Sequence, residues 1–487
     1  MVDPGETLSA PEPRAAPNRL GQLFEAQRRA HSADPLVGAQ VRIDRLDRAI
    51  DLLIHNQQRI CAALAADFGQ RPAGLSGFMD LFPAVHALKY ARKHVRRWMR
   101  PQRTRLGMPL GISGARGAIE PQPLGVIGVV SPWNFPIALT FGPLAGVLAA
   151  GNRCLLKPSE LTPSVSALIQ ELVAKSFDES ELAVITGGSD VAREFVSLPF
   201  DHLVFTGSTQ VGRQVMEAAA QHLTPVTLEL GGKCPVIIGR QANLGRAVDR
   251  ILMAKLANAG QMCLAPDYVC VPRALIDQFV ALSKSWARRA YPHLPSNDDY
   301  TSLIDDRHIE RIRALEADAI AKGATIVALG TETAVPRRAP RLVSPALILN
   351  ATRDMRVMQE EIFGPLLPIN PYDRIEEVIT EINRRERPLA LYFFGGDRAE
   401  EGAVLSHTIS GGVTLNDIAM HFLAEELPFG GIGASGMGAY HGEHGFRRFS
   451  HQRAVLRRGR FDLAGWAGLR PPYTSRLQRS LRLLIRR

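Results

Sequence analysis

The sequence is poor in cysteine, and its cysteines show no arrangement that predicts disulfide bonds. Five occur among 487 residues, at positions 61, 154, 234, 263 and 270. Because their number is odd and their spacing follows no pattern, we expect no disulfide framework, and a reducing compartment such as the cytoplasm is favoured. The start, Met1–Pro17, lacks the apolar stretch of a secretory signal and is predicted to be an irregular end.

Aromatic residues are also few, which limits the classes of partner. They make up 6% of the chain, and the net charge of +10 gathers in residues 92–105, 447–460 and the tail after 470. Few aromatics lie among these charges, and no nucleic-acid-binding module is visible, so no nucleic-acid partner is predicted. A solvated surface or an arginine-rich interface explains the charge, and attraction of an anionic substrate or acidic lipid stays open.

Long membrane-spanning runs and internal repeats are missing as well. Residues 121–152 carry no charge, but prolines at 132, 136 and 143 interrupt them. This pattern fits a buried strand, a loop and a buried helix better than a membrane span. The length exceeds that of one ordinary core, so at least two domains are expected, and a hydrophobic content of 46% is typical of a soluble globular enzyme.

The elements that are present alternate between short apolar runs and amphipathic helices. Helical periodicity marks residues 20–67 and 81–99 as outer helices, and 104–123 reads as an extended crossing segment. Strands are then predicted at 126–130, 154–156, 182–185 and 202–205, with helices at 143–150, 163–176, 189–196 and 210–220. This order predicts a parallel sheet with helices on both faces. A second α/β set follows residue 230, and the segment from Gly412 is expected to return to the first unit.

Three side chains in separate segments have the chemistry of acyl transfer. Cys263 follows a predicted helix tail and Gly260, Glu229 ends a β-rich run, and Asn134 stands between two prolines. A thiol, a carboxylate and a rigid amide can serve as nucleophile, water-activating base and oxyanion donor. Each residue alone has an ordinary explanation: a buried thiol, an ion-paired or capping carboxylate, and a turn residue.

A strand-to-helix turn at residues 205–212 offers a place for a dinucleotide. Gly207 and Ser208 lie at its mouth, where backbone N–H groups and the helix dipole suit a pyrophosphate. The turn is not GxGxxG, and such turns are common. Lys157 and Glu160 end a neighbouring strand and could bind ribose hydroxyls, although an exposed charged loop is the default interpretation.

Seven motifs in order connect these residues to a known family. The sequence contains SPWNFP (131–136), KPSE (157–160), FTGS (205–208), ELGGK (229–233), GQMC (260–263), EEIFGP (360–365) and PFGG (428–431). In order and spacing they resemble the aldehyde dehydrogenase superfamily over about residues 20–465. APDY (265–268), SGMG (435–438), YHG (440–442) and FSH (449–451) resemble its class 3 and coniferyl aldehyde dehydrogenase branch, which acts on aromatic or medium-to-long aliphatic aldehydes.

The resemblance implies an α/β fold of the aldehyde dehydrogenase type. It implies a Rossmann-like cofactor domain over residues 18–230 with 413–440, and an α/β catalytic domain over 231–412. Residues 104–123 and 441–487 would form bridging and oligomerisation segments with a tail. Members of the family are dimers or tetramers, so a homodimer is expected and a tetramer stays open.

The resemblance also implies a mechanism. Cys263 would attack an aldehyde carbonyl, and Asn134 with the Cys263 backbone N–H would hold the oxyanion. Hydride would leave for the nicotinamide, and Glu229 would activate the water that hydrolyses the thioester to a carboxylic acid. Two alternatives remain: a coenzyme A-dependent acylating dehydrogenase and a non-catalytic structural relative of the fold.

Cofactor contacts follow by the same resemblance. Glu361 would hold the nicotinamide ribose and Phe363 would pack near the ring. Lys157 and Glu160 would bind the adenosine ribose, and Gly207 and Ser208 the pyrophosphate. NAD is favoured because the Glu160 carboxylate should repel a 2′-phosphate, while NADP stays open. We predict no metal site.

Two regions carry less specific predictions. His421 and Phe422 are candidates for the substrate tunnel. After Pro471-Pro472, leucines at helical spacing among arginines predict a basic amphipathic helix. It would lie on an anionic membrane surface as a peripheral contact, guard the substrate entrance, or pack against a partner subunit.

Overall fold

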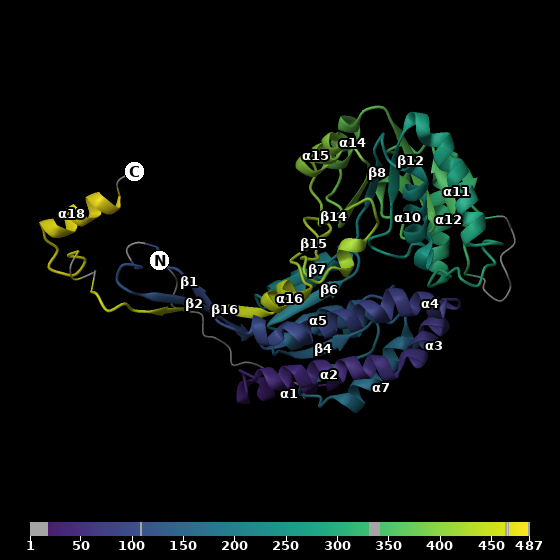
Figure 1. The fold of residues 1–487 in the computed structure, drawn as a ribbon. Coiled ribbons are helices and arrows are strands. Elements are labelled where there is room, and N and C mark those ends of the chain that lie inside the picture. The colour runs from purple at the N-terminus through teal and green to yellow at the C-terminus, as the bar shows by residue number, and fades with distance from the viewer. Residues whose placement is uncertain (1–17, 108–109, 331–340, 463–464, 466, 486–487) are drawn as a thin grey trace, which may run out of the picture.

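Three β-sheets organise the chain (Figure 1). A computed structural model describes residues 18–107, 110–330, 341–462, 465 and 467–485. The predicted irregular start, 1–17, lies outside the described residues. The order of helices and strands confirms an α/β fold.

The first unit is built on a six-stranded sheet with the order β15-β7-β6-β3-β4-β5. Its strands are β3 (Val126–Val130), β4 (Arg153–Lys157), β5 (Leu182–Val184), β6 (His202–Thr206), β7 (Val226–Glu229) and β15 (Gly436–Met437). The five strands from β3 to β7 pair in parallel, which confirms the prediction, and β15 joins β7 antiparallel. The parallel strands are almost entirely buried, as expected for a sheet covered on both faces.

Two layers of helices cover this sheet. The helices of the unit are α1 (Arg19–Ala33), α2 (Ala39–His55), α3 (Gln57–Phe68), α4 (Ala73–Ser76), η1 (Gly77–Leu81), α5 (Phe82–Trp98), α6 (Ala138–Ala149), α7 (Pro163–Ser176), α8 (Ser189–Val196) and α9 (Thr209–Ala220). Apolar residues of α2, α5, α6 and α7 share one core, while α1, α8 and α9 share another. Neighbouring residues of β4 alternate between the two cores, because successive side chains of a strand point to opposite faces.

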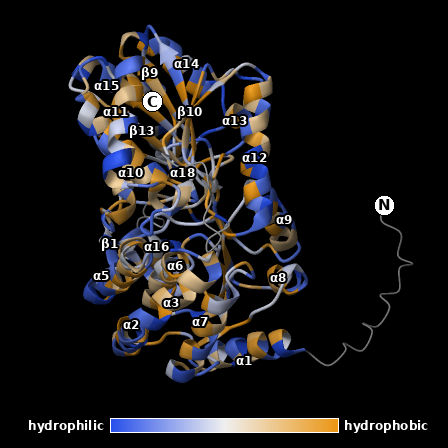
Figure 2. Cartoon of the chain, turned by 90° about the vertical axis from the view of Figure 1, so that its right-hand side faces the viewer, coloured by the Kyte–Doolittle hydropathy of each residue, from blue (hydrophilic) through white to orange (hydrophobic). Residues whose placement is uncertain are grey.

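The second unit contains a seven-stranded sheet with the order β10-β11-β12-β9-β8-β13-β14. Its strands are β8 (Pro235–Ile238), β9 (Tyr268–Pro272), β10 (Thr325–Ala328), β11 (Ala346–Leu349), β12 (Leu366–Tyr372), β13 (Ala390–Phe394) and β14 (Gly412–Leu415). Its main helices are α10 (Leu244–Leu256), α11 (Ile276–Ala290), α12 (Asp306–Ala321), α13 (Arg356–Gln359), α14 (Ile375–Asn383) and α15 (Arg398–His407). Figure 2 shows hydrophobic strands of this sheet enclosed by helices with hydrophilic outer faces.

Two details differ from the prediction. Strand β14 pairs with β13 in the second sheet, so the chain rejoins the first sheet only at β15 and not at residue 413. Helix α6 begins at Ala138, five residues before the predicted start at Pro143. The Asp80 carboxylate accepts the backbone N–H groups of Ile137 and Ala138, and this distant cap starts the helix early.

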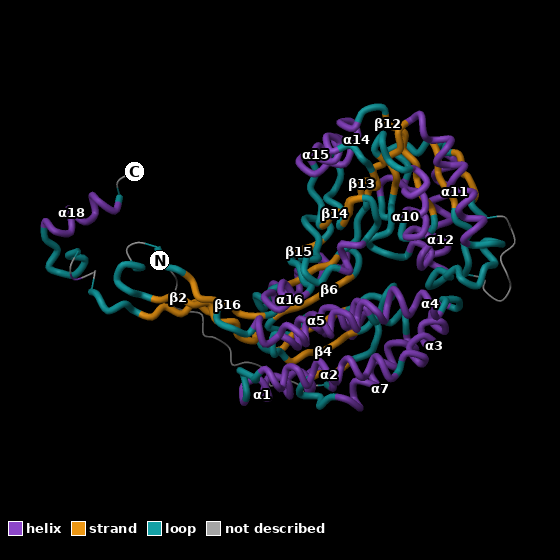
Figure 3. The backbone as a smooth tube through the Cα atoms, in the orientation of Figure 1, coloured by secondary structure: helices purple, strands orange, loops and turns teal. Residues whose placement is uncertain are grey.

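A third, antiparallel sheet projects from the body as an arm (Figure 3). It contains β1 (Gln102–Thr104), β2 (Arg116–Pro123) and β16 (Ser450–Arg457), which follows α16 (Gly442–Arg448). The predicted extended segment 104–123 therefore lies in this arm. The tail beyond it forms α18 (Ser475–Leu484), as the leucine spacing predicts, while Arg486 and Arg487 lie outside the described residues. Across the described part of the chain, no helix combines the length and apolar character needed to cross a membrane.

Candidate active site

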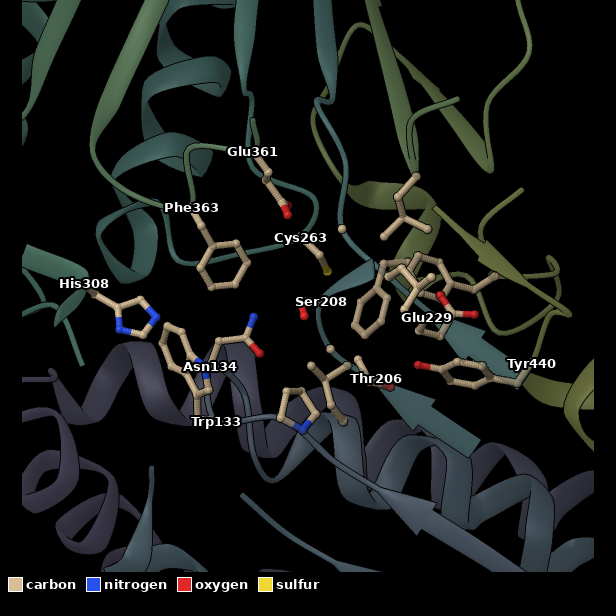
Figure 4. Close-up of a pocket in the computed structure, with 18 of the residues that line it drawn as sticks. Trp133, Asn134, Thr206, Ser208, Glu229, Cys263, His308, Glu361, Phe363 and Tyr440 are labelled. Atoms are coloured by element: carbon tan, nitrogen blue, oxygen red, sulfur yellow. The ribbon is translucent and has the colours of Figure 1, made fainter. Parts of the chain in front are cut away.

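Cys263, Glu229 and Asn134 line one cavity of about 260 Å³ (Figure 4). Glu229 ends β7, Asn134 lies in the loop between β3 and α6, and Cys263 lies between α10 and β9. The two units thus supply different walls of the cavity. The structure brings together the three side chains that the sequence analysis combined.

A turn with left-handed backbone conformation precedes Cys263 and places it at the cavity. Helix α10 ends at Leu256, and Asn258, Ala259 and Gly260 then have φ of 49°, 51° and 75°. A Cβ at Gly260 would lie 2.3 Å from the carbonyl oxygen of Gly364. Glycine is therefore required here by both the backbone conformation and the close approach.

The buried side chain of Gln261 stabilises the loop after Gly260 through hydrogen bonds. Its Nε2 donates to the backbone oxygens of Asn258 (2.9 Å) and Ser302 (3.1 Å), and its Oε1 accepts from the Ile304 N–H (2.9 Å). Because these bonds tie the loop to a distant segment, they restrain the backbone that carries Cys263.

The Cys263 thiol is protonated at rest. Burial raises the pKa of Cys263 to about 12, and the nearby Glu361 and Glu229 carboxyls add to the rise. Desolvation and negative neighbours both disfavour the thiolate. The side chain is still partly exposed to the cavity, so a small electrophile can reach it.

This pKa predicts how Cys263 is alkylated in the protein without dinucleotide. Because only the thiolate reacts, the rate with iodoacetamide should rise about tenfold for each pH unit between about pH 7 and 9, with no plateau. Peptide mapping by mass spectrometry gives the rate at Cys263 separately from that at Cys61, the other partly exposed cysteine. A plateau below pH 8 would show a thiolate at rest and contradict the prediction.

Glu229 is buried without a hydrogen-bond partner. Its side chain is 3% exposed, and neither carboxylate oxygen has a partner among the described residues. Burial raises the pKa of Glu229 well above its usual value. A carboxylate whose pKa is raised is a stronger base than one in water, so Glu229 is suited to accept a proton.

Asn134 is held from both its side chain and its backbone. Its Nδ2 donates to the backbone oxygen of Gln261 (3.2 Å), which joins the two loops of the site. Its carbonyl oxygen accepts from Arg71 Nη1 (2.9 Å) and Asn258 Nδ2 (3.2 Å). Arg71 in turn pairs with the fully buried Asp80 at 3.2 Å. Burial raises the pKa of Asp80 to about 6, although Arg71 opposes that rise.

Replacing Arg71 should therefore destabilise the protein strongly. Arg71→Met leaves Asp80 buried without its counter-ion, and the expected loss is about 3–5 kcal/mol of unfolding free energy. Urea unfolding measures it. The exposed pair Arg374–Glu376 provides a control, since Arg374→Met should change stability by less than about 1 kcal/mol. Equal losses in the two variants would contradict a special role for the buried pair.

Glu361 lies on the other side of the cavity against a glycine. A Cβ at Gly231 would lie 1.9 Å from a Glu361 carboxyl oxygen, and the backbone N–H of Gly232 donates to that carboxyl. Burial raises the pKa of Glu361 to about 8, and Asp267 adds to the rise. The two glycines of the ELGGK motif thus make room for the carboxyl and bind it.

Two charged residues of the motifs support the loop that carries Glu361. Lys233 Nζ pairs with Asp267 and donates to the backbone oxygens of Val357 (2.7 Å) and Glu360 (3.0 Å). The Asp267 carboxylate also accepts from the Ile362 N–H at 2.9 Å. Sequence reasoning quoted both residues in motifs but gave neither of them this role.

Aromatic and small residues line another part of the cavity. Trp133 contacts Phe363 edge-to-face with ring centroids 5.4 Å apart, and His308 with centroids 5.0 Å apart. Gly207 and Ser208 line the same cavity, and Ser208 Oγ caps α9 by accepting from the Val211 N–H (3.3 Å). Aromatic walls, a helix N-terminus and a buried carboxyl suit a nicotinamide ring, a phosphate and a ribose respectively.

The remaining predicted cofactor residues lie outside this cavity. Lys157 is buried, its Nζ lies 3.5 Å from Glu160, and it donates to the Pro158 oxygen (3.0 Å). Neither Lys157 nor Glu160 lines the cavity. Phe422 does line it, whereas His421 does not and instead contacts Thr414 Oγ1 (2.7 Å).

Several residues of the cavity escaped the sequence analysis. They are Trp133, Leu139, Thr206, His308, Arg311, Leu389, Phe429 and Tyr440. Four of them lie in motifs that the sequence analysis quoted, so the sequence already pointed to these segments: Trp133, Thr206, Phe429 and Tyr440. His308 and Arg311 come from α12, whose sequence has no motif. Over the described residues, no group of three or more His, Cys, Asp or Glu side chains is placed to bind a metal ion.

Comparison with known proteins gives four consistent matches. A model of the aldehyde dehydrogenase family matches residues 6–455. A coniferyl aldehyde dehydrogenase of a Pseudomonas species is 46% identical, with 96% of each chain covered. The substrate-bound structure of Staphylococcus aureus AldH superposes with a TM-score of 0.89 at 33% identity, covering 96% of this chain and all of that one. A Mycobacterium tuberculosis aldehyde dehydrogenase complexed with NAD+ has a TM-score of 0.81 at 28% identity, covering 91% of this chain and 90% of that one.

Proposed function

The chain belongs to the aldehyde dehydrogenase family and is an oxidoreductase that oxidises aldehydes with a nicotinamide dinucleotide, and we propose that Cys263 carries this reaction through a thioester. The observation that carries the proposal is the meeting of Cys263, Glu229 and Asn134 in one cavity. The sequence alone left open a coenzyme A-dependent reaction and a non-catalytic relative. Nothing in the comparisons favours either alternative.

In the first half of the reaction, the Cys263 thiol gives its proton to water, and its sulfur bonds to the carbonyl carbon of the aldehyde. Asn134 Nδ2 carries two hydrogens, and Gln261 accepts one of them, so the other is free for the developing oxyanion. The backbone N–H of Cys263 is the second donor. The dinucleotide, when bound, accepts the hydride that leaves this carbon. Trp133, Phe363, Gly207, Ser208 and Glu361 are the residues that would hold its nicotinamide half.

In the second half, Glu229 takes a proton from water as the water oxygen bonds to the thioester carbon. The carbon–sulfur bond breaks and the carboxylic acid leaves. The desolvated setting of Glu229 suits this step, because a raised pKa makes the carboxylate a stronger base than it is in water.

We propose an aromatic aldehyde of the coniferyl type as substrate. The relative from Pseudomonas is a coniferyl aldehyde dehydrogenase, and apolar side chains of Leu139, Phe422 and Phe429 line the cavity beside Cys263. A panel of benzaldehyde, coniferyl aldehyde and decanal, followed by the absorbance of reduced dinucleotide, tests this. The highest kcat/KM should belong to coniferyl aldehyde. No reduction with any aldehyde would reject the function, and a preference for decanal would reject the substrate class.

NAD is the proposed cofactor. Glu160 is about half exposed and pairs with Lys157, so a 2′-phosphate at this place would meet a carboxylate. The same panel run with each dinucleotide should give a higher kcat/KM with NAD than with NADP.

We further propose that the chain forms a homodimer in the cytoplasm. The three-stranded arm stands out from the body with exposed strands, and unpaired strand edges favour pairing with a second chain (Figure 3). All five cysteines are free thiols, which suits a reducing compartment. Analytical ultracentrifugation should give twice the chain mass; a monomer at micromolar concentration would exclude the dimer.

Helix α18 is proposed to bind an anionic membrane surface. It lies apart from the body, carries Arg476, Arg479 and Arg482, and leaves Leu481 partly exposed (Figure 1). The full-length protein should co-sediment with phosphatidylserine-containing vesicles and not with neutral ones. Deletion of the residues after Arg470 should abolish that binding. If the full-length and tail-deleted proteins pelleted equally, the proposal would be contradicted. The helix would then have one of its other two predicted roles, packing against a partner subunit or guarding the substrate entrance.

A further inference from the structure

Three buried polar groups without partners meet beside Cys263. They are the Glu229 carboxylate, the Thr206 hydroxyl and the Tyr440 hydroxyl, and none has a hydrogen-bond partner among the described residues. All three residues line the cavity that contains Cys263. Because native proteins rarely leave buried polar groups unpaired, this cluster indicates a place where water or substrate completes the hydrogen bonds.

Strand pairing brings the three groups together. In the six-stranded sheet, Glu229 of β7 pairs with Thr206 of β6 on one side and with Gly436 of β15 on the other. The chain then reaches Tyr440 four residues after Gly436. In Figure 4 the Tyr440 ring lies beside the Glu229 carboxylate, and its hydroxyl points into the cavity toward Thr206.

The position of the Tyr440 hydroxyl is fixed. The backbone of Tyr440 exchanges two hydrogen bonds with Phe429, of 2.9 and 2.8 Å. Its ring packs edge-to-face on Phe429 with centroids 5.9 Å apart and on His441 with centroids 4.9 Å apart. The side chain is 1% exposed. A group held this tightly is oriented before the substrate arrives, and that orientation is useful in catalysis.

Tyr440 remains a hydrogen-bond donor throughout the reaction. Burial raises the pKa of Tyr440 well above its usual value, and the carboxyl of Glu229, the thiol of Cys263 and the carboxyl of Glu425 add to the rise. A neutral phenol can donate to a water that also binds a carboxylate, and such a chain of hydrogen bonds stabilises the ionised carboxylate. Among the described residues neither the Tyr440 hydroxyl nor the Thr206 hydroxyl bonds to Glu229 directly, so a water between them would complete the hydrogen bonds of all three groups.

We propose that Tyr440 is a positioning residue for deacylation, whose hydroxyl donates to the hydrolytic water beside the Glu229 carboxylate. Through that water it favours the ionised carboxylate and aims the water at the thioester. This inference rests on the proposed role of Glu229 as base. The water gives its proton to Glu229, its oxygen bonds to the acyl carbon, and Cys263 leaves with the electrons of the carbon–sulfur bond. Tyr440 keeps its own proton, and Thr206 Oγ1 accepts the second hydrogen of the same water, so one lone pair of the water oxygen remains to bond to the acyl carbon.

The titratable groups that face this part of the cavity come from four elements. Cys263 lies in the loop after α10, Tyr440 follows β15, Glu361 follows α13, and His308 and Arg311 come from α12. Of these, Tyr440 and Cys263 are the groups coupled to Glu229 by charge. Removal of the phenol oxygen should therefore change the ionisation of Glu229 most directly.

Tyr440→Phe tests the proposal. The burst of reduced dinucleotide should keep its rate and amplitude, because Tyr440 does not act in acylation. The steady rate should fall about tenfold, the usual cost of losing one hydrogen bond to a charged group. The Glu229 carboxylate loses a stabilising contact, so its pKa rises. In a plot of kcat against pH, the limb over which kcat increases should therefore move to higher pH. Burst amplitude counts folded active sites, so the steady rate is expressed per site.

The matched control is Tyr372→Phe. It removes another buried tyrosine hydroxyl, which donates to the Ile238 oxygen (2.6 Å) and does not line the cavity. This variant should keep both the steady rate and the pH limb. An unchanged steady rate and limb in Tyr440→Phe would overturn the proposal, as would equal slowing of burst and steady rate. Absence of a burst in the unaltered protein would instead reject the thioester mechanism itself.

Discussion

Cys263→Ala should abolish both the burst of reduced dinucleotide and steady turnover with aldehyde. The methyl side chain cannot bond to the carbonyl carbon, so no hydride donor forms. Loss of a covalent nucleophile typically costs at least about 10³-fold in rate. Rapid-mixing absorbance measurements with coniferyl aldehyde and NAD follow both phases.

Cys61→Ala is the control for this variant. Cys61 is also a partly exposed free thiol, but it lies in α3 and does not line the cavity. It should keep full activity. A normal burst in Cys263→Ala would show that another group attacks the aldehyde, and it would reject the mechanism.

Glu229→Gln should separate the two halves of the reaction. The burst should persist, since Cys263 and Asn134 remain, while steady turnover falls about 10²-fold or more because the thioester has lost its base. Glutamine has nearly the same shape as glutamate, and the native oxygens have no hydrogen-bond partner among the described residues. A structural defect is therefore not expected from this change.

The burst amplitude is the internal control for Glu229→Gln. An amplitude of about one per active site shows that acylation is intact in the folded protein. An unchanged steady rate would remove Glu229 from the role of base. Loss of the burst together with the steady rate would place Glu229 in acylation instead.

Local signals predicted much of the fold. Helix α7 spans Pro163–Ser176, as the sequence predicted, because a proline at its first position marks its start. The strands of the first sheet agree with prediction to within two residues, since each is a short apolar run. Helix and strand identity is a property of the nearby sequence in these segments.

Distant contacts determined what the sequence could not show. The early start of α6 depends on Asp80, more than fifty residues away in the chain. The left-handed turn before Cys263 is held by Gln261, which bonds to Ser302 and Ile304. Neither contact has a local pattern, so both became visible only in the folded chain.

In the site as well, local motifs predicted some residues, and distant contacts placed the others. Motif residues identified Cys263, Glu229 and Asn134, and the fold brought them to one cavity. His308 and Arg311 enter that cavity from α12, and Arg311 Nη1 donates to the backbone oxygen of Glu361 (3.1 Å). Tyr440 was part of a quoted segment, but its place beside Glu229 depends on the antiparallel pairing of β15 with β7.

The most direct test is the mass of the trapped protein. Glu229→Gln is mixed with coniferyl aldehyde and NAD, quenched in acid after the burst, and analysed intact and as peptides by mass spectrometry. We expect each active chain to gain the mass of one acyl group, located on Cys263 and removed by hydroxylamine. A full burst with no acyl adduct, or with the adduct on another residue, would contradict a Cys263 thioester.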